Sequence, residues 1–235
     1  TLGASGLAWG VVIGSFLHVA VQYPALRRTG FHFEFGLRAA WQNEQVRRVL
    51  TLMIPRSLGM AVNQVGLLVM TIFASTLVSG SLAAFTLANN IQSVPLGLFG
   101  IAFSLAAFPA LALFAAQKSD RDFFRMFAET TRKILFFVVP LSIFIIIFRA
   151  QCVRVILGTG EFDWQDTITT FEVLKFLALS LFAQSLIPLF ARAFFALQNT
   201  KTPLYIALVS EAVHIALIPL LLPYYEVEGL AIAFS

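Results

Sequence analysis

The stretch Phe85–Pro109 is long enough to cross a bilayer as one helix, but its two halves differ in character. The second half is almost pure hydrocarbon, whereas the first half carries Asn89, Gln92 and Ser93 and ends at Pro95. Polar groups inside an apolar span are costly unless they face other protein or a water-filled cavity. Because these three polar residues are three and four positions apart, a helix places them on one face. The stretch therefore predicts a membrane helix with a polar stripe facing a cavity and a middle loosened by proline.

The composition is that of a protein that resides in a membrane. Hydrophobic residues make up 59% of the chain and charged residues only 12%, with a mean hydropathy of +0.85. A soluble domain usually has about 25% charged residues, so this chain cannot cover a globular surface with charge. The pI near 9.6 is better explained by membrane topology than by nucleic acid, because the basic residues lie in loops beside apolar segments. Cys152 is alone, which excludes a disulfide or thiolate metal site within this chain.

Apolar segments recur along the chain, and about 20 mainly apolar residues are needed for one crossing. They predict an all-α, polytopic transmembrane helix bundle with six spans and the start of a seventh. The spans are expected at about residues 2–23, 49–78, 81–115, 134–148, 176–197 and 204–222, with a turn at 223–229 before the seventh begins at 230. Residues 26–48 combine arginines with aromatic residues, which is typical of a segment in the membrane interface. Because the sequence begins at Thr1 and stops at Ser235 inside an apolar run, we expect it to be part of a longer protein.

The loop charges orient the bundle. The loops that follow residues 25, 116 and 198 hold eleven basic residues: Arg27, Arg28, Arg38, Arg47, Arg48, Lys118, Arg121, Arg125, Arg132, Lys133 and Lys201. The opposite loops hold two, Arg149 and Arg154. By the positive-inside rule, the first set of loops is cytoplasmic.

The sequence contains no motif that predicts catalysis or a metal site. There is no Gly-rich phosphate loop, no GxSxG, no CxxC and no histidine pair at metal-ligand spacing, so an enzyme is not expected. The outstanding ionisable residues are Glu211 and His214, which share a helix face within the sixth span. An acid in a membrane span predicts a functional site, here a proton or cation relay. The alternative is a local pair that only holds the bundle together.

Two further sets of polar residues have both a functional and a structural interpretation. Asn63 and Gln64 could point into the same cavity as the stripe, or could form hydrogen bonds between helices. Arg192 and Arg56 lie near the cytoplasmic ends of their spans and could meet an anionic headgroup, because guanidinium suits phosphate. The alternative is snorkelling to the interface, which we favour for Arg56.

Several local patterns resemble one family, the MurJ (MviN) lipid II flippases of the MOP superfamily. They are SVPLGLFGIAFSLAAFPAL at 93–111, ARAFFALQNTKTP at 191–203, GTGEFDWQDT at 158–167 and the opening GLAWGVVIGSFLHVAVQYPAL. They occur in the order and at the spacing of the family across essentially the whole chain. The aromatic-Ala-x-x-(Asp/Asn)-Thr-Lys-Thr-Pro turn is the most specific of them.

The resemblance implies a fold of two six-helix lobes and a terminal helix pair, of which this chain would be helix six to the start of helix twelve. Residues 1–25 would be the last helix of the N-terminal lobe, 26–48 a cytoplasmic interfacial linker, and 49–235 the truncated C-terminal lobe. The implied activity is alternating-access transport of lipid II across the bacterial plasma membrane for cell-wall synthesis. Other possibilities are a polysaccharide-lipid exporter or drug/cation antiporter of the same superfamily, or a membrane scaffold that transports nothing.

The implied partners are an undecaprenyl-type lipid-linked glycan and membrane lipids, without nucleic acid, and the implied state is a monomer. No cofactor is expected beyond a coupling cation or proton. The residues expected to bind the headgroup are Asn89, Asn90, Gln92, Ser93, Arg192 and Gln64, and those expected to couple an ion are Glu211 and His214. The chain departs from many members of the family, which carry an Asp-Arg pair and a Glu where this chain has Asn89, Asn90 and Ser93. It also has Met70 where other members have Asp or Asn, and His214 where other members have Asn.

Overall fold

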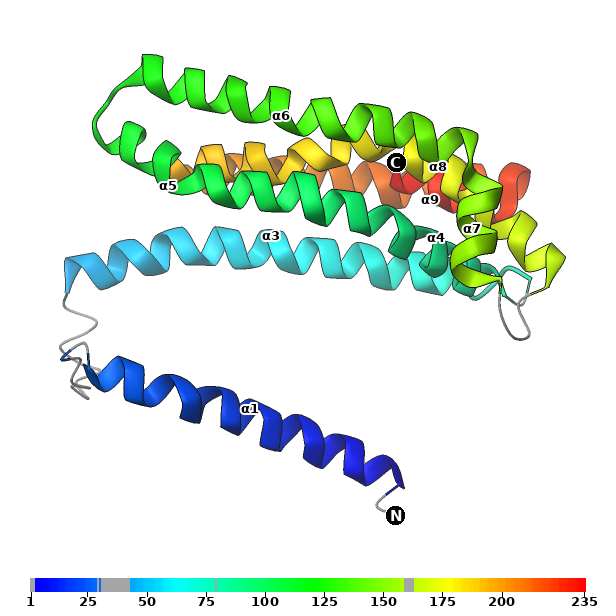
Figure 1. Ribbon diagram of the computed structural model, residues 1–235, viewed down its shortest axis with the longest axis horizontal. Coiled ribbons are helices and arrows are strands. Elements are labelled where there is room, and N and C mark those ends of the chain that lie inside the picture. Colours follow the sequence, from blue (N-terminus) through cyan, green and yellow to red (C-terminus); the bar gives the residue numbers. More distant parts are fainter. Residues whose placement is uncertain (1–2, 29, 31–42, 79, 159–162) are drawn as a thin grey trace. The chain divides into compact units, whose positions relative to one another are not determined.

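The computed structural model describes residues 3–28, 30, 43–78, 80–158 and 163–235, and every regular element among them is a helix (Figure 1). In chain order these are α1 (Gly3–Arg28), α3 (Glu44–Ala74), α4 (Ser81–Pro95), the π-helix η1 (Leu96–Ile101), α5 (Ala102–Ala116), α6 (Asp120–Ile147), α7 (Arg149–Leu157), α8 (Trp164–Ala196) and α9 (Lys201–Phe234). Within the described residues, six helices are long and apolar enough to cross a membrane. The predicted all-α bundle with six spans is confirmed.

The chain divides into two compact units, Thr1–Arg48 and Val49–Ser235. In the first unit, α1 exposes large apolar side chains on every side, among them Trp9 (61% exposed), Phe16 (74%) and Val21 (76%). Such a helix requires an apolar environment around it. The interfacial segment expected at residues 26–48 lies largely outside the described residues, and its assignment to a linker between lobes stays a prediction.

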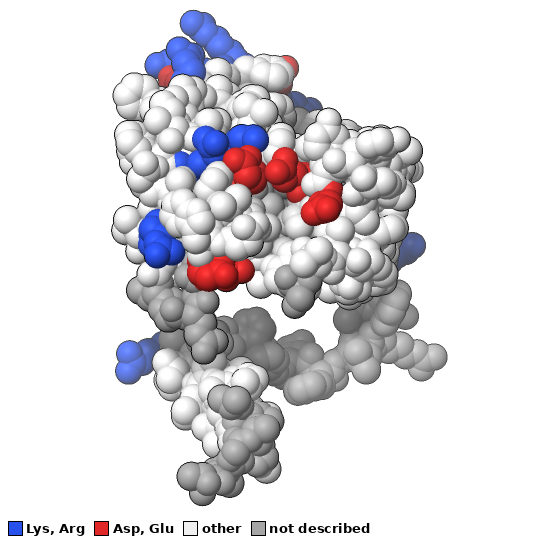
Figure 2. Space-filling view, turned by 90° about the vertical axis from the view of Figure 1, so that its right-hand side faces the viewer, with Lys and Arg blue, Asp and Glu red and all other residues white. Residues whose placement is uncertain are grey.

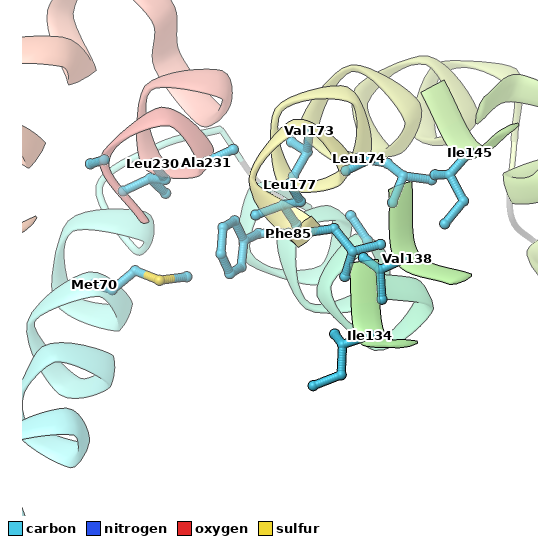
Figure 3. Packing of buried hydrophobic residues seen from close by; sticks show 14 of the residues in the cluster. Met70, Phe85, Ile134, Val138, Ile145, Val173, Leu174, Leu177, Leu230 and Ala231 are labelled. Carbon is cyan, nitrogen blue, oxygen red and sulfur yellow. The ribbon is translucent and has the colours of Figure 1, made fainter. Parts of the chain in front are cut away.

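The second unit is built around α8. This helix contacts α4, η1, α5, α6, α7 and α9, and it supplies six apolar residues with no exposed surface: Val173, Leu174, Leu177, Ala178, Leu181 and Leu189. Figure 3 shows the layer in which Leu174 and Leu177 meet Phe85 of α4 and Val138 of α6. The start of α8 is fixed by a capping box, in which Asp163 and Asp166 each accept a hydrogen bond from the other's backbone N–H.

The span 81–116 is interrupted at its middle, as the sequence predicted. Pro95 ends α4, and the next six residues form η1 before α5 resumes the regular helix. A proline lacks the N–H for a normal helical bond, and short π segments inside helices often mark functional positions. At this joint the helix approaches α8 closely, because a Cβ on Gly100 would lie 2.8 Å from the carbonyl oxygen of Ser185.

The chain reverses direction inside α9. Glu226 has non-helical angles (φ 46°, ψ −122°), and a Cβ on Gly229 would lie 2.9 Å from the carbonyl oxygen of Leu221. The Phe234 ring lies 5.9 Å from that of His214, whereas 20 residues of straight helix would separate them by about 30 Å. Residues 227–234 therefore pack back on the first part of α9, which confirms the predicted turn and the start of a seventh span.

Two predicted boundaries differ from the helices. The fourth span was expected to begin at residue 134 and the fifth at 176, but α6 begins at Asp120 and α8 at Trp164. In both cases a polar segment is helical and continues into the apolar span, so each helix is longer than the span that hydropathy predicted.

Candidate functional site

The polar residues of α4 do not share one face in the way the spacing predicted. Gln92 is buried (2% exposed), and its Nε2 donates a 2.9 Å hydrogen bond to the carbonyl oxygen of Leu177 in α8. Asn90 and Ser93 are exposed and Asn89 is half-buried. The expectation that Gln92 lines a cavity together with Asn89 and Ser93 was therefore wrong for Gln92, which lies in the packed interface between two helices.

The reason is the buried stripe of α4, which consists of Ser81, Ala84, Phe85, Ala88, Gln92 and Pro95. These residues recur every three or four positions, so Gln92 falls on the side that packs against α8. Its Oε1 is buried without a hydrogen-bond partner in the described structure. The exposed polar side of α4 is thus formed by Asn90 and Ser93, with Asn89 at its border.

On α3, both Asn63 and Gln64 are exposed. The structure gives their side chains no hydrogen bond to any described residue, so within this part of the chain they do not join two helices. Gln64 as a residue that contacts a headgroup stays a prediction.

Glu211 and His214 form a polar pair inside the membrane-spanning part of α9. The Nδ1 of His214 lies 2.8 Å from Oε1 of Glu211, and the two side chains are 12% and 16% exposed, respectively. The remaining ring nitrogen of His214, Nε2, is buried without a partner among the described residues. The structure therefore confirms that the two side chains share a helix face and shows that they are largely shielded.

The surroundings of this pair come from three separate segments. The Glu211 carboxylate lies against Gly66 of α3, in the space that a Cβ at that position would occupy. The edge of the Phe234 ring packs on His214, with ring centroids 5.9 Å apart, and Phe85 of α4 packs on Phe234 at 5.7 Å. Gly66, Phe85 and Phe234 were not singled out in the sequence, because only the reversal of α9 and the packing of α3 bring them to Glu211.

This arrangement suits a proton or a monovalent cation. A carboxylate and an imidazole at hydrogen-bond distance can share a proton, and Nε2 offers one more donor or acceptor position. No group of three or more His, Cys, Asp and Glu residues able to hold a metal ion is found among the described residues. The site is thus defined by two ionisable side chains inside an apolar enclosure.

Arg192 and Arg56 lie on neighbouring helices, α8 and α3. Nη1 of Arg192 donates a 3.2 Å hydrogen bond to the carbonyl oxygen of Pro188, and the Arg56 guanidinium stands 5.1 Å from the centre of the Phe195 ring. Phe195 follows Arg192 by three residues on α8, so the ring that Arg56 approaches lies about one helical turn from Arg192. Nothing in the sequence links these two arginines, and only the packing of separate helices places them at the same end of the bundle.

A second charged group lies at the opposite end of the bundle, where α7 meets α8. The carboxylate of Glu172 is 2.6 Å from Nζ of Lys175 and 3.6 Å from Nη2 of Arg149, whose guanidinium stands over the Phe171 ring. Figure 2 views the molecule from this end and shows basic and acidic side chains side by side on a largely uncharged surface. This group was not predicted from the sequence, and its contacts hold α7 on α8.

The architecture defines a class of protein, an integral membrane protein whose helices form a transmembrane bundle. Solved structures share the fold. One is "Lipid II flippase MurJ, inward closed conformation", with a TM-score of 0.70 and 23% identity over 87% of this chain and 42% of that one. Another is an outward-facing multidrug resistance MATE family transporter of the MOP superfamily, with a TM-score of 0.71 and 16% identity over 86% and 44%.

The chain belongs to the MurJ family, whose model, described as lipid II flippase MurJ, matches residues 1–235. Among its relatives, a probable lipid II flippase MurJ of Bdellovibrio bacteriovorus is 32% identical over 228 residues, covering 97% of this chain and 43% of the relative. The corresponding protein of Haemophilus influenzae is 31% identical over 233 residues, covering 97% and 45%. The chain spans less than half the length of these relatives. Membership and the six apolar helices identify it as part of a multi-pass protein of the bacterial plasma membrane.

Proposed function

We propose that the protein to which this chain belongs moves lipid II from the cytoplasmic to the outer leaflet by alternating access. The observation that carries this proposal is the match of the family model to the whole chain. The likeness to a MATE transporter is a likeness of fold at 16% identity, and it gives no argument for a drug as cargo. We further propose that the protein acts as a monomer and catalyses no covalent chemistry.

In this proposal, the exposed polar side of α4 contacts the headgroup. Asn90 and Ser93 are exposed and Asn89 is half-buried, so their amide and hydroxyl groups can exchange hydrogen bonds with water for hydrogen bonds with sugars and pyrophosphate. Gln92 is not included because its side chain is occupied in the interface with α8. The joint at Pro95 and η1 allows the two halves of the span to change their angle when the lobe moves.

Glu211 and His214 are proposed to couple transport to a proton or a monovalent cation. The pair joins α9 to α3 through the contact of Glu211 with Gly66. When a cation or proton neutralises the carboxylate, its interaction with His214 and its cost of burial both change. The packing of α3 against α9 then depends on whether the ion is bound, and a change of this kind can bias a lobe between two conformations.

The test is depletion of the full-length protein in living cells, followed by measurement of the leaflet in which lipid II resides. We expect lipid II to accumulate in the cytoplasmic leaflet, and restored expression of the intact protein to reverse the effect. An unchanged distribution between leaflets would contradict the proposal and would favour a scaffold that transports nothing.

A further inference from the structure

Arg56 and Arg192 form a cationic pair at the end of the second unit where α8 ends and α9 begins. Arg192 lies four residues before the last residue of α8, which is about 6 Å along the helix axis. The side chain of Leu204, in the first turn of α9, lies beside Gly59 of α3, one turn beyond Arg56. The pair is therefore close to the helix ends, on the side where the loop charges are mainly basic.

The positive charge of this pair is not balanced by the part of the chain that the structure describes. The ion pairs found there involve Arg125, Arg149, Lys175 and His214, and neither Arg56 nor Arg192. A guanidinium has five N–H donors, and the only hydrogen bond from the pair to a described residue is the bond from Arg192 to Pro188. Arg192 is half-buried and Arg56 is exposed, and two like charges brought near each other are unfavourable unless an anion joins them.

Phe195 fixes the orientation of one member of the pair. The Arg56 guanidinium stands 5.1 Å from the centre of that ring, an arrangement in which the ring face attracts the cation. The stacking leaves the N–H edge of Arg56 open, and this edge matches a phosphate through two parallel hydrogen bonds. Lysine does not offer this geometry.

The exposed surface of α3 beside the pair carries apolar side chains, with Asn63 among them. Met60 (68% exposed) and Leu67 (40% exposed) follow Arg56 at intervals of four and eleven residues, so they lie on the same side of α3. They extend from the arginine toward the middle of the span. A ligand with an anionic head and a hydrocarbon chain can thus place its head on the arginines and its chain along α3.

We propose that Arg56 and Arg192 form a binding site for the phosphate or pyrophosphate of a lipid headgroup, between α3 and α8 at the cytoplasmic end of the bundle. The inference is independent of the proposed flippase activity, because both a bilayer phospholipid and the transported lipid carry the required group. It adds a site that is distinct from the polar side of α4.

The test is native mass spectrometry of the full-length protein in detergent, with phosphatidylglycerol as the probe and diacylglycerol as the matched lipid without phosphate. The double variant Arg56→Gln with Arg192→Gln is expected to bind phosphatidylglycerol at least about tenfold more weakly, because two charge-assisted bonds are lost. Diacylglycerol binding is expected to stay unchanged. The matched control is Arg132→Gln, since Arg132 also donates to a carbonyl four residues earlier, that of Ala128, but lies on α6.

Competition with lipid II identifies the source of the phosphate. Displacement of phosphatidylglycerol from the wild-type protein by lipid II would assign the site to the transported lipid, and retention would assign it to a bilayer lipid. Equal binding of phosphatidylglycerol by the wild-type protein and by the double variant, or an equal loss in Arg132→Gln, would overturn the proposal. If the double variant does not fold, the single Arg56→Gln, at an exposed position, decides the question by the same comparison.

Discussion

At the scale of single residues, the central contact is between Glu211 and Gly66. The carboxylate occupies the space where a side chain at position 66 would begin, and it is held there by the 2.8 Å interaction with His214. This contact joins α9 to α3 one turn before the buried Met70. It makes the position sensitive both to added volume and to the charge of the acid.

The sensitivity of this contact to added volume can be tested with Gly66→Ala. The added methyl group overlaps the Glu211 carboxylate, so we expect the full-length protein to lose about 1–3 kcal/mol of stability, as for other overpacked sites. The matched control is Gly59→Ala on the same helix, where the nearest atom to an added Cβ is Cδ1 of Leu204 at 4.0 Å. We expect Gly59→Ala to be neutral or stabilising by up to about 1 kcal/mol, because alanine favours helix. Thermal unfolding in detergent gives both values, and equal midpoints would contradict the contact.

The role of the negative charge on Glu211 can be tested with Glu211→Gln, which keeps the shape of the side chain. If Glu211 couples an ion, this variant is expected to remove the dependence of transport on pH or on the cation, while leaving the protein folded. The control is Glu129→Gln, because Glu129 forms an ion pair with Arg125 at an exposed position on α6. A pH and cation profile of Glu211→Gln identical to that of the wild-type protein would remove Glu211 from the mechanism.

At the scale of elements, α4 has a packed side and an exposed polar side. Gln92 belongs to the first and Asn90 to the second. Helical spacing alone put the polar residues on a common face, but the boundary between packed and exposed positions passes between them. Only the packing of α4 on α8 decides where that boundary lies.

The different roles of the packed and the exposed side of α4 can be tested with Gln92→Leu and Asn90→Leu. Gln92→Leu removes one buried hydrogen bond together with one buried unpaired oxygen, so its stability is expected to change by no more than about 1 kcal/mol, with transport retained. Asn90→Leu is expected to leave the fold intact and to reduce transport, because it removes an exposed hydrogen-bonding group. Unfolding midpoints and a lipid II transport assay measure both effects. The reverse outcome, in which Gln92→Leu folds normally but does not transport, would place Gln92 in the substrate path.

At the scale of the whole molecule, α8 is the element that holds the second unit together, and the basic loops predict its direction in the membrane. The α8 helix packs against α4, η1, α5, α6, α7 and α9, and six of its apolar residues have no exposed surface. The α3 helix contributes Met70 and Ala74 to the buried apolar cluster, and the contacts of Arg56 with Phe195 and of Gly66 with Glu211 add to this packing.

The direction of the bundle can be tested by cysteine labelling in intact cells. Arg121→Cys lies in the loop region after residue 116 and Gln165→Cys at the opposite end, and both positions are exposed. We expect a membrane-impermeant maleimide to label Gln165→Cys but not Arg121→Cys. The native Cys152 gives a low background at neutral pH, because burial raises the pKa of its thiol and the thiolate is the reactive form. Labelling in the opposite pattern would reverse the assigned topology.

The sequence by itself determined the class of fold and the number of spans, because the hydropathy of a segment can be judged without knowing its neighbours in space. The loop charges also predict an orientation. The sequence also paired Glu211 with His214, since three positions on one helix need no tertiary information. The tertiary structure alone decided that Gln92 is buried, that α9 reverses and brings Phe234 to His214, and that Arg56 stands over Phe195 beside Arg192 on α8. These facts depend on which faces of separate helices pack together. Because a bilayer favours apolar residues on every face of a helix, the hydropathy of the sequence does not show which faces pack against protein.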